Sequence, residues 1–199
     1  VLSRNGLNAS DNLFYSYYNN YDPTIYAPTY EILNNYYEPG NIIKDSTNVY
    51  NYGFGFFFVG LANIPVWYQV TYQGNSAGMT TSDLIMMKAE CLIRTNKVNE
   101  GMDEINKIRI RLIAPYSPLV ASTEAQAMAY LQKVSRIEFL FTWRNFVDLK
   151  RWNKEGIYPV AVARTINGTT YSLPANSKLW VFPFPQSATQ FNENLTQNY

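Results

Sequence analysis

The stretch from Ser135 to Trp152, SRIEFLFTWRNFVDLKRW, indicates the architecture of this chain more clearly than any other. Large apolar side chains recur at three- and four-residue intervals up to and into this stretch, which is the period of one face of an α-helix. They are Met128, Leu131, Val134, Ile137, Leu140 and Phe141. The pattern is interrupted near Trp143 and resumes from Phe146 to Trp152. We therefore predict two successive helices with a short break between them.

Two carboxylates and two guanidinium groups lie on or near the apolar faces of this stretch, together with Trp152: Arg136, Glu138, Asp148 and Arg151. Partly buried charges of opposite sign tend to pair, because an unpaired ion away from water is costly. The alternative is that Glu138 and Asp148 form a glycosidase-like acid and nucleophile. Neighbouring arginines favour ionised carboxylates, whereas a general acid must be protonated. We predict a structural role.

A helical hairpin is predicted upstream. Its first helix, capped by Ser82, carries apolar side chains on one face: Leu84, Met87, Cys91 and Leu92. Its second helix, capped by Asn99, does the same with Met102, Ile105, Ile108 and Leu112. We expect Cys91 to be a buried, unreactive thiol. Two such helices resemble one tetratricopeptide-type hairpin, which cannot cover its own apolar face and must pack against something else.

A third helix is expected to begin at Ser122 or Thr123, where Glu124 and Gln126 suit the first turn. Before the hairpin, residues 1–78 are rich in Tyr, Asn, Gly and Phe, with a short helix opening after Pro28 and an extended segment at 67–72. From Gly156 onwards we expect loops and short strands. The prediction is a mostly α fold: a helical hairpin packed with large irregular loop-rich segments (1–78 and 156–199) and a few short strands.

Three motifs in this order resemble the SusD/RagB family. The Ser135–Trp152 stretch resembles its signature, in which Arg-x-Glu-Leu/Phe and a Phe-rich turn precede Asp-Leu-x-Arg-Trp. Residues 83–90, DLIMMKAE, are similar to its Asp-Val-Leu-Leu-Met-Tyr-Ala-Glu helix, including Asp83 and Glu90, and Ile105-Asn106-x-Ile108-Arg109 follows. The ending LWVFPFPQSATQFNENLTQNY is similar to the family's closing segment. The resemblance implies that residues 1–199 are the carboxy-terminal portion of a SusD-like domain.

Three departures from the family pattern place individual ion pairs in question. The usual Glu-Gly-x-Arg is replaced by the run Thr142 to Asn145. The Arg that commonly precedes the Asp83 helix is Thr80, and an Asp-x-Arg after Tyr37 is not recognisable.

Composition excludes several kinds of site. Sixteen Lys and Arg balance fifteen Asp and Glu, for a net charge of +1, so a nucleic-acid partner is not expected. Histidine is absent, which removes His-dependent triads and His-ligated metals. We expect no cofactor, no metal and no catalytic residue. No run is long and apolar enough to cross a bilayer, so a membrane anchor would lie outside this chain.

The aromatic first region is the candidate binding surface. Sugar rings stack on flat aromatic side chains, while their hydroxyls bond amides and tyrosine oxygens. The candidate ligand-contacting residues are Trp67, Tyr17, Tyr18, Tyr21, Tyr36, Asn19 and Asn20. Each of these tyrosines can equally pack its ring inward with only its hydroxyl at the surface.

The resemblance implies a lipoprotein on the outer face of the outer membrane, which binds nutrient oligosaccharide or peptide for a SusC-like TonB-dependent transporter. The missing amino-terminal part would carry the lipidated cysteine. Two alternatives stay open: a carbohydrate-active hydrolase, and a helical-repeat adaptor between proteins.

Overall fold

The computed structural model describes residues 15–16, 30–41, 75–76, 80–140, 142–192 and 194–197. The chain forms two compact units, Val1–Asn145 and Phe146–Tyr199. The secondary structure of the described residues is mainly helical, which confirms the predicted mostly α fold. No helix among these ranges has the length and apolar character that a membrane crossing demands.

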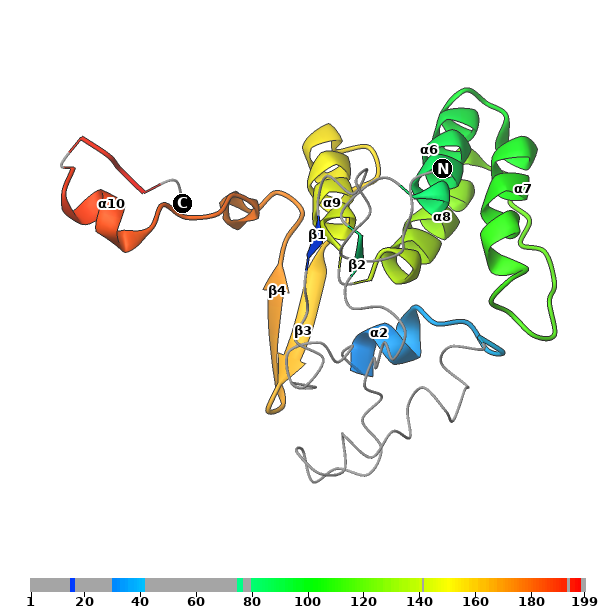
Figure 1. The fold of residues 1–199 in the computed structure, drawn as a ribbon, viewed down its shortest axis with the longest axis horizontal. Helices are drawn as coiled ribbons and strands as arrows, with labels where there is room; N and C mark the ends of the chain where they lie inside the picture. Colours follow the sequence, from blue (N-terminus) through cyan, green and yellow to red (C-terminus); the bar gives the residue numbers. More distant parts are fainter. Residues whose placement is uncertain are drawn as a thin grey trace. The chain divides into compact units, whose positions relative to one another are not determined.

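Three helices form the core of the first unit: α6 (Thr81–Arg94), α7 (Val98–Arg109) and α8 (Glu124–Glu138). They lie side by side, and each packs against the other two (Figure 1). The large side chains that are almost fully buried are Met86, Ile93, Ile105, Ile108, Met128 and Leu131. Four of these six belong to the periodic patterns of α7 and α8 that the sequence showed.

The helix starts differ in part from the prediction. Helix α6 is capped by Thr80 rather than by Ser82, since Thr80 and Asp83 bond each other's backbone N–H in a capping box. The cap position of α7 is Lys97, and the predicted cap Asn99 lies inside the helix. Thr123 caps α8 as expected, with its hydroxyl accepting from the Gln126 N–H at 3.2 Å.

The predicted apolar face of α6 is the wrong one. Leu84 is 60% exposed and Cys91 is exposed too, so the expectation of a buried thiol is also wrong. The face that α6 buries carries Ser82, Asp83, Met86, Ala89, Glu90 and Ile93. Three of these residues, Ser82, Asp83 and Glu90, are polar.

Each buried polar residue of α6 has a partner. The Ser82 hydroxyl donates to the Glu138 carboxylate. Asp83 accepts from Thr80 and pairs with Arg144 at 3.0 Å. The Glu90 carboxylate pairs with Arg94 at 2.9 Å. Satisfied hydrogen bonds remove most of the cost of burial, and an apolar periodicity alone does not reveal them.

Gly101 sets how closely α6 and α7 approach. A Cβ atom at this position would lie 2.5 Å from Ile93 Cγ1 and 3.0 Å from the Ala89 carbonyl oxygen. Only a residue without a side chain allows the two backbones this distance.

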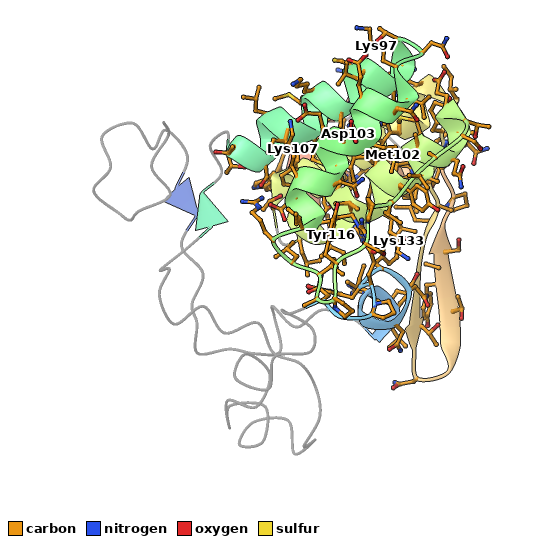
Figure 2. The ribbon with its side chains drawn as sticks, turned by 90° about the vertical axis from the view of Figure 1, so that its right-hand side faces the viewer. Lys97, Met102, Asp103, Lys107, Tyr116 and Lys133 are labelled. Carbon is orange, nitrogen blue, oxygen red and sulfur yellow. The ribbon has the colours of Figure 1, made fainter. Side chains whose placement is uncertain are left out.

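On the outward side of α7, Asp103 and Lys107 are exposed, whereas Met102 is buried (Figure 2).

The second unit contains most of α9 (Trp143–Glu155), followed by strands β3 (Val162–Ile166) and β4 (Thr169–Leu173). The break that precedes α9 agrees with the prediction. β3 and β4 pair antiparallel as a two-stranded ribbon (Figure 1). Its turn has φ +49° at Asn167 and +78° at Gly168, the left-handed pair that a tight hairpin requires. The 3₁₀ helix η1 (Lys178–Trp180) and α10 (Gln186–Gln190) follow.

Among its described residues, the aromatic first region contributes three short elements. α2 (Tyr30–Asn35) is the helix predicted after Pro28. β1 (Tyr15–Ser16) and β2 (Asn75–Ser76) pair antiparallel. The extended segment predicted at 67–72 lies outside the described residues.

Candidate functional site

The candidate ligand-contacting residues fall in two groups. Tyr36 lies in the described part of the chain. The other six lie outside the described residues: Tyr17, Tyr18, Asn19, Asn20, Tyr21 and Trp67. Their role as a binding surface therefore stays a prediction.

Tyr36 follows α2 and is half-buried. Its ring packs with Ile137 and Leu140 against a small apolar cluster built on Ile32 and Tyr37. Tyr36 therefore has an apolar backing and a partly exposed surface, as a ring that both supports the fold and contacts a ligand would have.

The segment 36–41 is attached to the loop after α7 through the backbone. The Ala114 N–H donates to the Gly40 carbonyl at 2.8 Å, and Asn41 forms an isolated antiparallel bridge with Ile113. Gly40 has φ +77°, and a Cβ there would collide with the Ala114 carbonyl oxygen. Glycine is thus required at this position for both its conformation and its size.

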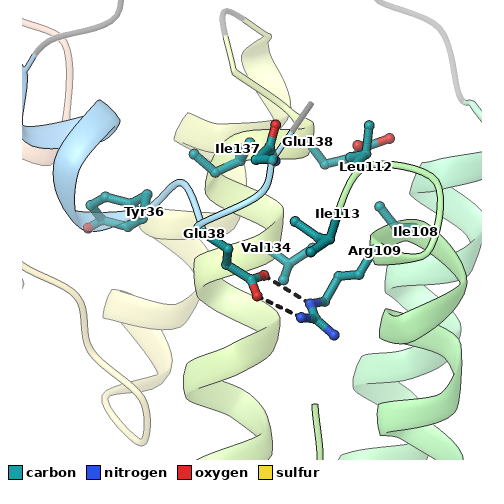
Figure 3. Close-up of a pocket in the computed structure, with 10 residues that line it drawn as sticks. Tyr36, Glu38, Ile108, Arg109, Leu112, Ile113, Val134, Ile137 and Glu138 are labelled. Atoms are coloured by element: carbon teal, nitrogen blue, oxygen red, sulfur yellow. Dashed lines mark hydrogen bonds and ion pairs between the residues drawn. The ribbon is translucent and has the colours of Figure 1, made fainter. Parts of the chain in front are cut away.

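A buried arginine makes the strongest side-chain contact with this segment. Arg109 Nε donates to Glu38 Oε1 at 2.9 Å, and Nη2 donates to Oε2 at 2.6 Å (Figure 3). This is the two-point geometry in which guanidinium and carboxylate fit best. The Arg109 side chain is 4% exposed and that of Glu38 is 22% exposed, so the pair is well shielded from water.

The same guanidinium also holds the loop that follows α7. Nη1 donates to Asn106 Oδ1 at 2.7 Å and to the Ser117 carbonyl at 3.0 Å. The Asn106 side chain in turn bonds both backbone groups of Leu119, at 2.9 and 3.0 Å. The Tyr116 ring centroid lies 5.7 Å from the guanidinium carbon, within cation–π range.

A shallow pocket opens beside this network (Figure 3). Its lining combines apolar side chains with two carboxylates: Tyr36, Glu38, Asn41, Ile108, Arg109, Leu112, Ile113, Val134, Ile137 and Glu138. The free volume inside it is about 20 Å³, which is room for one water molecule. The pocket lies where segment 36–41 meets α7 and α8.

The two carboxylates that a hydrolase would need are both occupied. Glu138 accepts from the Ser82 hydroxyl. Asp148 is buried and accepts from Arg151 Nη2 at 3.3 Å. Arg151 also bonds Glu155 at 3.3 Å, and its guanidinium lies 5.5 Å from the centroid of the buried Trp152 ring.

One carboxylate has a displaced pKa. Hydrogen bonds from Lys107 at 2.8 Å and Lys88 at 2.6 Å lower the pKa of Glu104 below its ordinary value of 4.5, against the opposing effect of burial. Because Lys88 belongs to α6 and Glu104 to α7, their contact links the two helices of the hairpin. A carboxylate with a lowered pKa is no proton donor at neutral pH.

A family model described as the SusD family matches residues 9–199. The chain belongs to the SusD family. No curated protein matches the chain. No solved structure matches it.

The SusD family is known for binding nutrients, glycans among them, at the cell surface, and its members are generally not catalytic. It is associated with the outer membrane and works with SusC-like transporters. These are properties of the SusD family as a whole.

The structure gives the departures from the SusD pattern a local explanation. Where Glu-Gly-x-Arg is replaced, the Arg144 side chain pairs with Asp83, as described above. The Asn145 amide donates to the carbonyls of Arg136 and Phe139, at 3.1 and 2.8 Å. These contacts hold the break between α8 and α9. Thr80, in place of the usual Arg, supplies the cap of α6.

Among the described residues, no three His, Cys, Asp or Glu side chains are grouped as a metal site would need. Two residues of the Arg109 network, Asn106 and Arg109, stand in the SusD-like helix pattern, but no role was predicted for them from the sequence. A polar pair on an otherwise apolar helix face is the signal that would have found them. Their partner Glu38 is 71 residues from Arg109, a distance that no local pattern bridges.

Proposed function

We propose that this chain captures nutrient oligosaccharide at the outer face of the outer membrane and delivers it to a SusC-like TonB-dependent transporter. Membership of the SusD family over residues 9–199 is the observation that carries the proposal. Binding is non-covalent, by stacking on aromatic side chains and hydrogen bonds from amides and hydroxyls. Tyr36 is the proposed contact within the described residues. The further proposed contacts are Tyr17, Tyr18, Asn19, Asn20, Tyr21 and Trp67.

The signature residues have a structural role in this proposal. Glu90 and Asp148 each pair with an arginine of their own helix, and Asp83 of α6 pairs with Arg144 of α9. Glu138 holds the Ser82 hydroxyl, and Arg136 lies half-buried in the last turn of α8. Side chains engaged in this way support the scaffold and leave recognition to rings and amides.

Calorimetric titration with a panel of defined neutral and acidic oligosaccharides and of peptides tests the proposal. We expect saturable binding of at least one oligosaccharide, weakened by Tyr36→Ala and by Trp67→Ala. Tyr171→Ala is the matched control, because Tyr171 is 60% exposed on the β3–β4 ribbon and is not a proposed contact. Absence of binding across the panel would contradict the proposal, and binding of peptides alone would change the ligand class.

Product analysis on the same glycans tests the hydrolase alternative. We expect no cleavage. Turnover that disappears in both Glu138→Gln and Asp148→Asn would replace the binding function with an enzymatic one. Pull-down of a SusC-like transporter with the chain as bait tests the delivery step, and failure to recover one would remove it from the proposal.

A further inference from the structure

We propose that Arg109 is a positioning residue for ligand capture, which fixes Tyr36 through its ion pair with Glu38. This inference rests on the proposed function, in which Tyr36 contacts the ligand. Arg109 itself contacts no ligand in the proposal. Its action is to hold segment 36–41 in one place against α7.

The contacts of Arg109 exceed what a simple ion pair needs. Four of its five N–H groups are used, two on Glu38 and one each on Asn106 and Ser117. One side chain therefore joins segment 36–41, the helix α7 and the loop after it. A lysine cannot replace this arrangement, because its single ammonium group lacks the planar fork.

Glu38 transmits this constraint to Tyr36. The two residues are separated only by Tyr37, which is 3% exposed and forms part of the apolar cluster on which Tyr36 packs. The close-up shows Glu38 turned toward Arg109 and Tyr36 on the other side of the same short segment (Figure 3). Since Tyr37 is anchored inward, a fixed Glu38 leaves the backbone at Tyr36 little freedom to turn.

Because it is buried, the pair of Arg109 and Glu38 should hold its two segments together more strongly than the exposed ion pairs of α7 do. Removing one partner of a shielded pair leaves an uncompensated charge, whereas exposed pairs contribute little. The pair of Lys97 and Glu100 on α7 is 3.7 Å apart, with side chains 56% and 60% exposed. Glu100→Gln is therefore the matched control for Glu38→Gln, with the same chemical change at an exposed pair instead of a shielded one.

The test uses the full chain and a glycan that the wild type binds. In Glu38→Gln, Arg109 keeps Asn106 and Ser117, so the helices remain folded. Segment 36–41 loses its charged anchor and keeps only the backbone contacts of Gly40 and Asn41 and the burial of Tyr37. We expect amide hydrogen exchange at residues 36–41 to accelerate on the order of tenfold. If about one molecule in ten then keeps Tyr36 in its binding position, glycan affinity should fall about tenfold, because apparent affinity scales with the fraction of competent molecules. Glu100→Gln should change neither quantity.

A double-mutant cycle separates positioning from general stability. If Glu38 acts through Tyr36, Glu38→Gln should not weaken glycan binding further in a Tyr36→Ala background, although hydrogen exchange at 36–41 still accelerates. Arg109→Lys, which keeps the charge but not the fork, should affect segment 36–41 and glycan affinity in the same direction. It should also accelerate exchange in the loop after α7, because the contacts with Asn106 and Ser117 are lost too.

Unchanged glycan affinity in Glu38→Gln, with exchange accelerated, would overturn the inference while the proposed function stands. Additive losses in the double variant would also overturn it, because Glu38 would then act without Tyr36. If the wild type binds no glycan, it is the proposed function that fails, and the positioning role falls with it.

Discussion

Glu104 shows how a single carboxylate can join two helices of the hairpin. It lies on α7, is 7% exposed, and accepts from Lys88 of α6 and from Lys107 of its own helix. Both lysines are more than half exposed, so water screens part of the attraction. The pair with Lys88 nevertheless links residues 16 apart in sequence across the hairpin.

Replacing Glu104 by Gln should lower the free energy of unfolding by about 1 kcal/mol at pH 7. Because the pKa of Glu104 is lowered in the folded state, the stabilisation is present above the unfolded pKa and is lost as pH falls through the folded pKa. The difference between wild type and variant should therefore begin to shrink below about pH 4.5 and vanish in stronger acid.

Urea unfolding at several pH values measures this difference. Glu100→Gln on the exposed side of α7 serves as the control and should stay within about 0.5 kcal/mol of wild type. A constant difference from pH 7 down to pH 3 would contradict the assignment of the stabilisation to the ionised Glu104 carboxylate.

At the level of elements, the close packing of α6 and α7 depends on Gly101, which has no side chain. Gly101→Ala should destabilise the chain by about 1–2 kcal/mol. The added methyl overpacks the contact with Ile93 and the Ala89 carbonyl, at about 1–3 kcal/mol, and the better helix propensity of alanine offsets up to about 1 kcal/mol. Thermal unfolding followed by circular dichroism measures the change.

Asn99→Ala, on the exposed side of the same helix, is the control and should be neutral or slightly stabilising. A Gly101→Ala variant as stable as the control would mean that α6 and α7 can separate without loss, contrary to the close packing of this contact.

The α6 helix also shows the limit of periodicity as a guide. Two nearly opposite faces of this helix contain apolar side chains at helical spacing. The face with Leu84 and Cys91 is the more apolar, yet the buried face is the one where Asp83 and Glu90 find cationic partners. The choice depends on Arg144, which lies in a different helix and is invisible to any window centred on α6.

At the level of the whole molecule, the second unit exposes several large apolar side chains within one short segment. Five residues between Leu179 and Phe191 are exposed and apolar or aromatic: Leu179, Val181, Phe182, Phe184 and Phe191. No charged residue occurs from position 179 to 192. Exposed apolar side chains that lie together on a surface are sites of association or dye binding.

The dye anilinonaphthalene sulfonate should therefore fluoresce with the native chain, and Phe182→Ser combined with Phe191→Ser should reduce the signal. These two rings are 64% and 84% exposed, so their loss should cost little stability. Ile166→Ser on the β3–β4 ribbon is the control, since Ile166 is 49% exposed and lies outside this segment. Equal fluorescence in all three proteins would contradict the prediction.

The sequence by itself determined the family, the mostly α fold, the break before α9 and the large apolar side chains that α7 and α8 bury. These features depend on local spacing and on ordered motifs, which the chain carries in its own succession of residues. The tertiary structure alone decided which face of α6 is buried, that Cys91 is exposed, and that Arg109 holds Glu38. Each of these is settled by a partner distant in sequence, because the free energy of burying a charge depends on what lies opposite it in space.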